Sequence, residues 1–93
     1  MDEAEVYKRQ TLVVENLLNH HPEFGLAEDP SFTSSERRIF ATVFQPDWDF
    51  FDDDYRKAYE YFSTKQAQTY SKAKQILKKW LLKYRVDLTG LGV

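Results

Sequence analysis

The chain has 93 residues, of which 42% are hydrophobic, 16% aromatic and 30% charged, and its formal net charge is −2. This length holds one domain, which excludes a catalytic barrel or a dinucleotide-binding α/β domain. The chain contains no cysteine, and this excludes disulfide scaffolds, zinc ribbons, thiol nucleophiles and iron–sulfur clusters. We expect a single soluble globular domain over residues 1–93, located in the cytoplasm and without a membrane segment, because the apolar runs are short and the start is acidic.

Residues 2–21 predict a first helix, because apolar side chains recur there at helical spacing. The expected buried face consists of Val6, Gln10, Val13, Val14, Leu17, Leu18 and His21. Acidic residues at the start and histidines at the end suit the two ends of the helix dipole. Pro22 ends the helix, and residues 22–32 contain two prolines and a glycine. They predict a connecting loop whose apolar side chains pack onto the helices.

The second expected helix covers residues 34–45. Thr33 and Glu36 stand three residues apart in the order of a capping box, in which each side chain binds a free backbone amide of the first turn. Pro46 disfavours helical geometry at the residue before it and therefore ends the segment. The expected core face consists of Ile39, Phe40, Val43 and Phe44.

Residues 47–62 predict a third helix, with Asp47 as its N-cap. Acidic and basic side chains stand four residues apart there in the favourable order, which predicts the ion pairs Asp52–Arg56 and Asp53–Lys57. The large apolar side chains follow a 3-4-3-4 spacing. This spacing predicts a thick buried seam of Trp48, Phe51, Tyr55, Ala58 and Phe62, widened by Phe50 and Tyr59.

Residues 65–85 predict a fourth helix. Ser63 followed by Gln66 has the form of a capping box and favours a tight break before this helix, so that the last two helices form an antiparallel hairpin. The alternative is one long helix of about 39 residues, which would expose its aromatic seam unless two copies paired. The buried face repeats the 3-4-3-4 spacing in Tyr70, Ala73, Leu77, Trp80 and Tyr84.

The predicted fold is therefore all-α, a small four-helix domain with a C-terminal helical hairpin. A dimer built on one long C-terminal helix is the alternative. The tail over residues 87–93 holds two glycines and apolar residues. We expect it to pack as an extended cap on the helices, rather than to remain free for capture by a partner.

The residue types that carry chemistry do not form a recognisable catalytic or metal site. Five carboxylates fall within residues 47–54, but their spacing differs from that of a calcium-binding EF-hand loop. His20 and His21 are adjacent, so their side chains diverge on a helix and do not hold one ion together. No glycine-rich phosphate loop is present. We expect no enzyme activity and no cofactor.

The number of aromatic residues favours a protein-binding function. Fifteen aromatic side chains exceed what we expect a four-helix domain of this size to enclose, and surplus aromatic residues commonly anchor interfaces. We expect a small regulator or adaptor that binds another protein or a second copy of itself, with core packing as the alternative role of each aromatic. An acidic surface from residues 23–36 and 47–54 could bind a basic groove of such a partner. The candidate partner-binding residues are Trp48, Phe51, Tyr55, Tyr59, Tyr70, Trp80 and Tyr84.

Charge is strongly polarised along the chain. Residues 1–63 carry 14 acidic and 6 basic side chains, whereas residues 64–93 carry 1 acidic and 7 basic. Either the basic fourth helix folds back on the acidic part, or it presents a face that binds nucleic-acid phosphates while Tyr70 or Tyr84 stacks on bases. The scarcity of arginine weighs against nucleic acid. The candidate phosphate-binding residues are Lys72, Lys74, Lys78, Lys79, Lys83 and Arg85.

Overall fold

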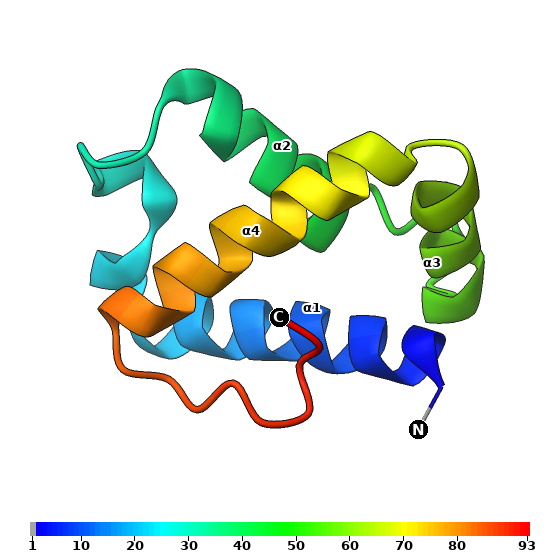
Figure 1. Ribbon diagram of the computed structural model, residues 1–93, viewed down its shortest axis with the longest axis horizontal. Helices are drawn as coiled ribbons and strands as arrows, with labels where there is room; N and C mark the ends of the chain where they lie inside the picture. Colours follow the sequence, from blue (N-terminus) through cyan, green and yellow to red (C-terminus); the bar gives the residue numbers. More distant parts are fainter. Residues whose placement is uncertain (1) are drawn as a thin grey trace.

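The computed structural model describes residues 2–93, which form four α-helices and two short 3-10 turns with no strand among them. In Figure 1, α4 crosses the middle of the molecule diagonally, with α1 along one side, α2 on the other and α3 at one end. The predicted all-α, four-helix domain is confirmed. The elements are α1 (Glu3–His20), η1 (Pro22–Phe24), η2 (Leu26–Glu28), α2 (Ser34–Phe44), α3 (Tyr55–Thr64) and α4 (Ala67–Lys83).

The core lies where α4 meets α2 and where α1 meets α3, the two helix pairs with the most extensive contact. The buried residues of α4 include the whole expected seam except Tyr84, which is half-buried. Burial of these side chains removes apolar surface from water and supplies most of the driving force for folding. The largest fully buried side chains are Trp80, Tyr7, Ile76, Leu77, Leu81, Gln10, Val14 and Val43. No helix within residues 2–93 has the length and apolar character needed to cross a bilayer.

Short polar side chains begin the first three helices, as the propensities of Asp and Thr at N-caps favour. The Asp2 carboxylate accepts a hydrogen bond from the Glu5 amide at 2.9 Å. The predicted capping box of α2 is confirmed, because the Thr33 hydroxyl accepts from the Glu36 amide at 3.1 Å and the Glu36 carboxylate accepts from the Thr33 amide at 2.9 Å. At the start of α3, the Asp54 carboxylate accepts from the amides of Arg56 and Lys57.

The buried face of α1 differs from the predicted one. Val14 and Gln10 are buried as expected, but the other predicted members are half-buried or, in the case of His21, exposed. Ala4, Tyr7 and Thr11 are buried in their place. The apolar pattern missed Tyr7 and Thr11 because their polar atoms find internal partners. The Tyr7 hydroxyl donates to the Val43 carbonyl oxygen at 2.6 Å, and the Thr11 hydroxyl donates to the Lys8 carbonyl at 2.8 Å.

The predicted helix over residues 47–62 was wrong in its first part, because residues 47–53 form a series of turns that we name the Phe50 turn. Asp47 caps no helix; its carboxylate accepts from the Asp49 amide at 3.1 Å within the turn. Asp52 and Asp53 have φ values of 54° and 57°, a left-handed conformation that aspartate tolerates better than most residues. A run of aspartates offers several competing caps and turns, and the helix begins only after the last of them, Asp54.

The two predicted ion pairs of this segment are also wrong, since the acids that precede α3 lie in turns. Lys57 pairs with Asp52 at 3.1 Å rather than with Asp53. Arg56 pairs with Asp2 at 3.0 Å. The second pair joins the start of α3 to the start of α1, so it stabilises the contact between two helices instead of one helix.

α3 and α4 are separate helices, as predicted, and the alternative of one long helix is wrong. The expected capping box is absent, because the Ser63 hydroxyl donates to the Glu60 carbonyl at 3.4 Å and Gln66 makes no side-chain cap. α4 ends in a Schellman motif, in which the Val86 amide donates to the Leu81 carbonyl at 3.0 Å. Arg85 has a φ of 58° in this motif, at the position where glycine is favoured.

The tail packs against α1, as expected. It turns back after α4 and returns to the middle of α1 (Figure 1). Leu91 is buried, and its carbonyl oxygen accepts a hydrogen bond from the buried Gln10 side chain. A Cβ atom on Gly92, whose φ is 66°, would lie 2.9 Å from the Val6 side chain. The close approach of the tail to α1 therefore requires glycine at this position.

Candidate protein-binding groove

The structure separates the candidate partner-binding aromatics into core and half-buried residues. Trp80 is 0% exposed, and Phe51 and Tyr70 are also buried. Trp80 and Tyr70 therefore have the core-packing role that was the alternative for each aromatic residue, whereas buried Phe51 also lines the groove described below. The fold encloses more aromatic area than the composition suggested. The remaining candidates are half-buried, namely Trp48, Tyr55, Tyr59 and Tyr84.

The tyrosines at the interface of α1, α3 and α4 have a structural role. The ring centroids of Tyr7 and Tyr59 both lie 6.0 Å from that of Tyr70. Burial raises the pKa of Tyr70 to about 12 and raises the pKa of Tyr7 further, because the phenolate form is poorly solvated there. The hydrogen bond with Glu3 raises the pKa of Tyr59. These hydroxyls therefore stay protonated, and they act as hydrogen-bond donors to Val43, Glu3 and Gln10.

Tyr84 is already engaged by a stack of rings at the opposite end of α4. Its ring stacks on Phe24 of η1 with centroids 4.0 Å apart. The Phe24 ring also stacks on the His21 ring, with centroids 4.7 Å apart. The Trp80 indole donates to the Phe24 carbonyl at 2.6 Å. The aromatic residues at this end therefore hold the connecting loop onto α4.

Two of the candidate phosphate-binding lysines contact the connecting loop of the same chain. Lys79 donates to the Ser31 carbonyl oxygen at 2.9 Å. Lys83 forms an ion pair with the buried carboxylate of Asp29. The basic helix thus folds back on part of the acidic half of the chain, which was the first of the two interpretations of the charge polarity.

The other four basic candidates are spread over α4 and its end. Lys74 lies with its ammonium 4.8 Å from the centroid of the Tyr70 ring. Lys72, Lys78 and Arg85 are exposed and make no ion pair within residues 2–93. Lys74 also makes no ion pair, and Lys79 contacts only a neutral carbonyl, so within residues 2–93 five of the six candidates keep an unpaired charge. Their spread over α4 and its end limits how many phosphates one nucleic acid can bring to them at once, and affinity grows with that number.

Acid should weaken the fold through Asp29. Hydrogen bonds from Lys83 and Ser31 lower the pKa of Asp29 from 3.8 to about 2. Because the folded-state pKa is the lower one, the stabilising contribution is complete above about pH 4 and is lost as the pH falls towards 2. We expect Asp29→Asn to unfold at lower urea concentration than the wild type at pH 7, and this difference to shrink between pH 4 and pH 2.

The control for this measurement is Asp49→Asn, because Asp49 is an exposed carboxylate that makes no ion pair in the described part of the chain. Its urea midpoint should follow the wild type at every pH. Backbone hydrogen bonds also lower the pKa values of three other carboxylates, so Asp29→Asn should keep part of its acid sensitivity; they are Asp2, Glu36 and Asp87. A gap between wild type and Asp29→Asn that is constant from pH 7 to pH 2 would contradict the assignment.

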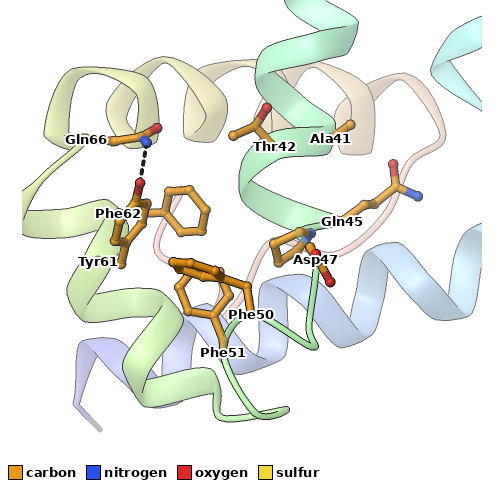
Figure 2. A pocket seen from close by; sticks show the side chains of 10 residues that line it. Ala41, Thr42, Gln45, Asp47, Phe50, Phe51, Tyr61, Phe62 and Gln66 are labelled. Atoms are coloured by element: carbon orange, nitrogen blue, oxygen red, sulfur yellow. Dashed lines mark hydrogen bonds between the residues drawn. The ribbon is translucent and has the colours of Figure 1, made fainter.

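A hollow lies between the end of α2, the Phe50 turn and α3, and we name it the Phe50 groove. Its volume is about 540 Å³, within the range of sites that hold small molecules or side chains. Figure 2 shows Phe50 and Phe51 between Tyr61 and Phe62 on one side and the end of α2 on the other. The lining residues are Ala41, Thr42, Gln45, Pro46, Asp47, Phe50, Phe51, Tyr61, Phe62 and Gln66.

Phe50 stands out because its side chain is held in place and yet remains 69% exposed. Its ring meets the Phe51 ring edge to face, with centroids 4.9 Å apart, and lies 6.0 Å from the Tyr61 ring. The Phe50 amide donates to the Asp47 carbonyl at 3.1 Å, and the Phe51 amide donates to the Trp48 carbonyl at 3.1 Å. These turn bonds direct one phenylalanine into the core and leave its neighbour at the surface.

The Phe50 turn beside the groove is acidic, and no basic residue occurs from Gln45 to Tyr55. Asp47 lines the groove, and Asp49 is exposed two residues further along the turn; we call these two carboxylates the acidic rim. Asp52 and Asp53 line a separate hollow. The C-terminal end of α2, where the helix dipole is negative, opens on the same side. The groove therefore has mainly apolar lining residues and negatively charged residues at its edge.

The sequence pattern placed Phe50 at the margin of the aromatic seam and did not single it out. A signal was available, because adjacent aromatic residues point to different sides of any regular element, so that Phe50 and Phe51 cannot both face the core. Among residues 2–93, no three His, Asp or Glu side chains lie together in a way that could hold a metal ion.

No protein-family model, curated protein or solved structure matches this chain. The function is accordingly inferred from the geometry and chemistry of its own residues.

Proposed function

We propose that this protein is a non-enzymatic protein-binding module, a small regulator or adaptor that accepts an apolar side chain of its partner in the Phe50 groove. The observation that carries the proposal is the 69% exposure of Phe50 beside a hollow of about 540 Å³. Leaving a phenylalanine ring in water is unfavourable by about 25 cal/mol for each Å² of apolar area. A partner that covers the ring recovers this free energy, and buried aromatic residues near the centre of an interface commonly dominate binding.

The groove is suited to a partner with basic residues beside its apolar anchor. The exposed carboxylates of the rim, Asp47 and Asp49, are free of ion pairs in the described part of the chain. A like-charged partner would be repelled, whereas lysine or arginine beside the anchor would speed the encounter and favour one orientation. We therefore expect the affinity to fall as salt is added.

The alternative function, nucleic-acid binding through α4, has less support. Lys79 and Lys83 contact the connecting loop of their own chain, and the acidic rim of the Phe50 groove would repel phosphates. Duplex DNA that binds at low salt, and loses affinity in Lys72→Glu but not in Phe50→Ala, would favour this alternative instead.

A peptide library displayed on phage and selected against the folded domain tests the protein-binding proposal. We expect the selected peptides to share an apolar anchor with neighbouring lysine or arginine residues. Titration calorimetry of one synthetic peptide should show that Phe50→Ala weakens binding at least about tenfold, which corresponds to about 1.4 kcal/mol. Phe50 is exposed, so the variant should fold like the wild type.

Leu12→Ala is the matched control, because Leu12 is 43% exposed and does not line the Phe50 groove. This variant should bind the selected peptide as tightly as the wild type. Selected peptides that are acidic, or whose affinity is the same for the wild type and for Phe50→Ala, would contradict the proposal.

A further inference from the structure

We propose that the partner of the Phe50 groove is the end of α4 of a second copy of this chain, so that copies associate head to tail. This inference rests on the proposed function, because it uses the same groove. Its starting point is Leu82, which is 53% exposed on the outer face of α4. Lys78 and Lys79 stand four and three residues before it on α4 and are exposed, although the Lys79 ammonium also donates to the Ser31 carbonyl. Residues at these spacings share one helix face. We name the surface of Leu82, Lys78 and Lys79, together with the exposed Arg85 beyond the end of the helix, the Leu82 ridge.

The Leu82 ridge and the Phe50 groove are complementary in shape and in charge. The ridge presents one apolar side chain among cations, and the groove presents an apolar hollow among carboxylates. A hollow of about 540 Å³ has room for a leucine side chain together with the methylene stems of the lysines beside it. The ammonium and guanidinium groups would then reach the acidic rim, which the exposed Asp47 and Asp49 carboxylates form.

The positions of the two surfaces require two different molecules. The groove lies between the end of α2 and α3, at one end of the long axis, whereas the C-terminal end of α4 lies at the other end (Figure 1). A chain therefore cannot place its own ridge in its own groove. When one copy inserts its ridge into the groove of the next, each partner still has one free surface. Such a heterologous contact lets further copies add, and it builds open chains unless the rotation between copies closes a ring.

Sedimentation velocity over a concentration series tests this inference with the intact chain. One apolar anchor on each side makes a small contact, so we expect association at about 100 µM and above, stronger at about 20 mM than at about 500 mM salt. The wild type should form dimers and longer chains as its concentration rises. Phe50→Ala removes the groove anchor and Leu82→Ala removes the ridge, and each variant alone should associate at least tenfold more weakly. Leu12→Ala should associate like the wild type.

The mixture of the two variants gives the sharpest readout. Phe50→Ala retains a ridge and Leu82→Ala retains a groove, so an equimolar mixture should form dimers that grow no further. If Leu82→Ala alone associates as strongly as the wild type, or if the mixture stays monomeric while the wild type associates, the head-to-tail contact is overturned. A wild type that stays monomeric at low salt also overturns it. In that case, basic peptides that still bind the groove would support the proposed function without self-association. If the wild type neither associates nor binds basic peptides, the head-to-tail contact and the proposed function are both overturned.

Discussion

Replacement of Trp80 by alanine is expected to lower the free energy of unfolding by about 3–5 kcal/mol, because the side chain is fully buried. Trp80 is 0% exposed and meets the Phe40 ring edge to face, with centroids 5.4 Å apart. Its indole also donates to the Phe24 carbonyl at 2.6 Å. Alanine would leave a cavity between α4 and α2 and an unpaired carbonyl in η1, and both changes cost stability.

Urea unfolding followed by far-ultraviolet circular dichroism measures this loss, since the signal does not depend on the deleted indole. Trp80→Phe keeps most of the volume but not the donor, so it should lie between the wild type and Trp80→Ala. Leu82→Ala, on the exposed face of the same helix, should change stability by less than about 0.5 kcal/mol. A loss below about 1 kcal/mol for Trp80→Ala would show that the side chain is not a core residue.

The second large effect is expected at Tyr7, where Tyr7→Ala should cost about 3–5 kcal/mol and Tyr7→Phe about 1–2 kcal/mol. Tyr7 is fully buried, and its hydroxyl donates to the Val43 carbonyl at 2.6 Å. Val43 lies in the last turn of α2, where carbonyls have no partner within the helix. Phenylalanine keeps the packing of the ring but leaves this buried carbonyl unpaired.

Chemical denaturation of the two variants separates the contribution of the ring from that of the hydroxyl. Tyr55→Phe is the control, because the Tyr55 hydroxyl makes no hydrogen bond within residues 2–93, and it should stay within about 0.5 kcal/mol of the wild type. Hydrogen exchange of the backbone amides near Gln45 should accelerate in Tyr7→Phe, because the C-terminal end of α2 loses its hydrogen bond from the Tyr7 hydroxyl. A Tyr7→Phe variant as stable as the wild type would contradict this role.

The Tyr7–Val43 bond also links stability to the Phe50 groove. The end of α2 and the residues that follow it, Gln45 and Pro46, line one side of the groove. A more mobile end of α2 would leave this side of the groove less ordered. A preformed groove pays a smaller entropic cost on binding, so this change should lower the affinity. Tyr7→Phe should therefore weaken binding of a groove ligand although Tyr7 lies in the core.

Local sequence signals predicted the parts of the fold that depend on neighbours in the chain. The capping box of Thr33 and Glu36, the end of α2 before Pro46 and the buried seam of α4 from Tyr70 to Trp80 all follow from residues within a few turns of one another. Their physical basis is local, because a cap satisfies nearby amides and an apolar stripe defines its own face.

The same rules failed where several local solutions compete. The aspartates of residues 47–54 can start a helix or make turns at similar cost. The turns prevail where Phe51 is buried while Phe50 stays outside. Such a choice depends on the whole core and not on the segment alone.

The sequence by itself determined that this protein is helical, where α2 begins and ends, and which face of α4 is buried, because these properties follow from short-range hydrogen bonds and periodicity. Only the tertiary structure decided that Tyr7 is a core residue and which groups the buried polar atoms of Tyr7 and Gln10 bind, since their partners lie 36 and 81 residues away in the chain. It also decided that Phe50 is exposed beside a groove with an acidic rim. A binding surface consists of what packing leaves uncovered, so it is defined only when all the helices have found their partners.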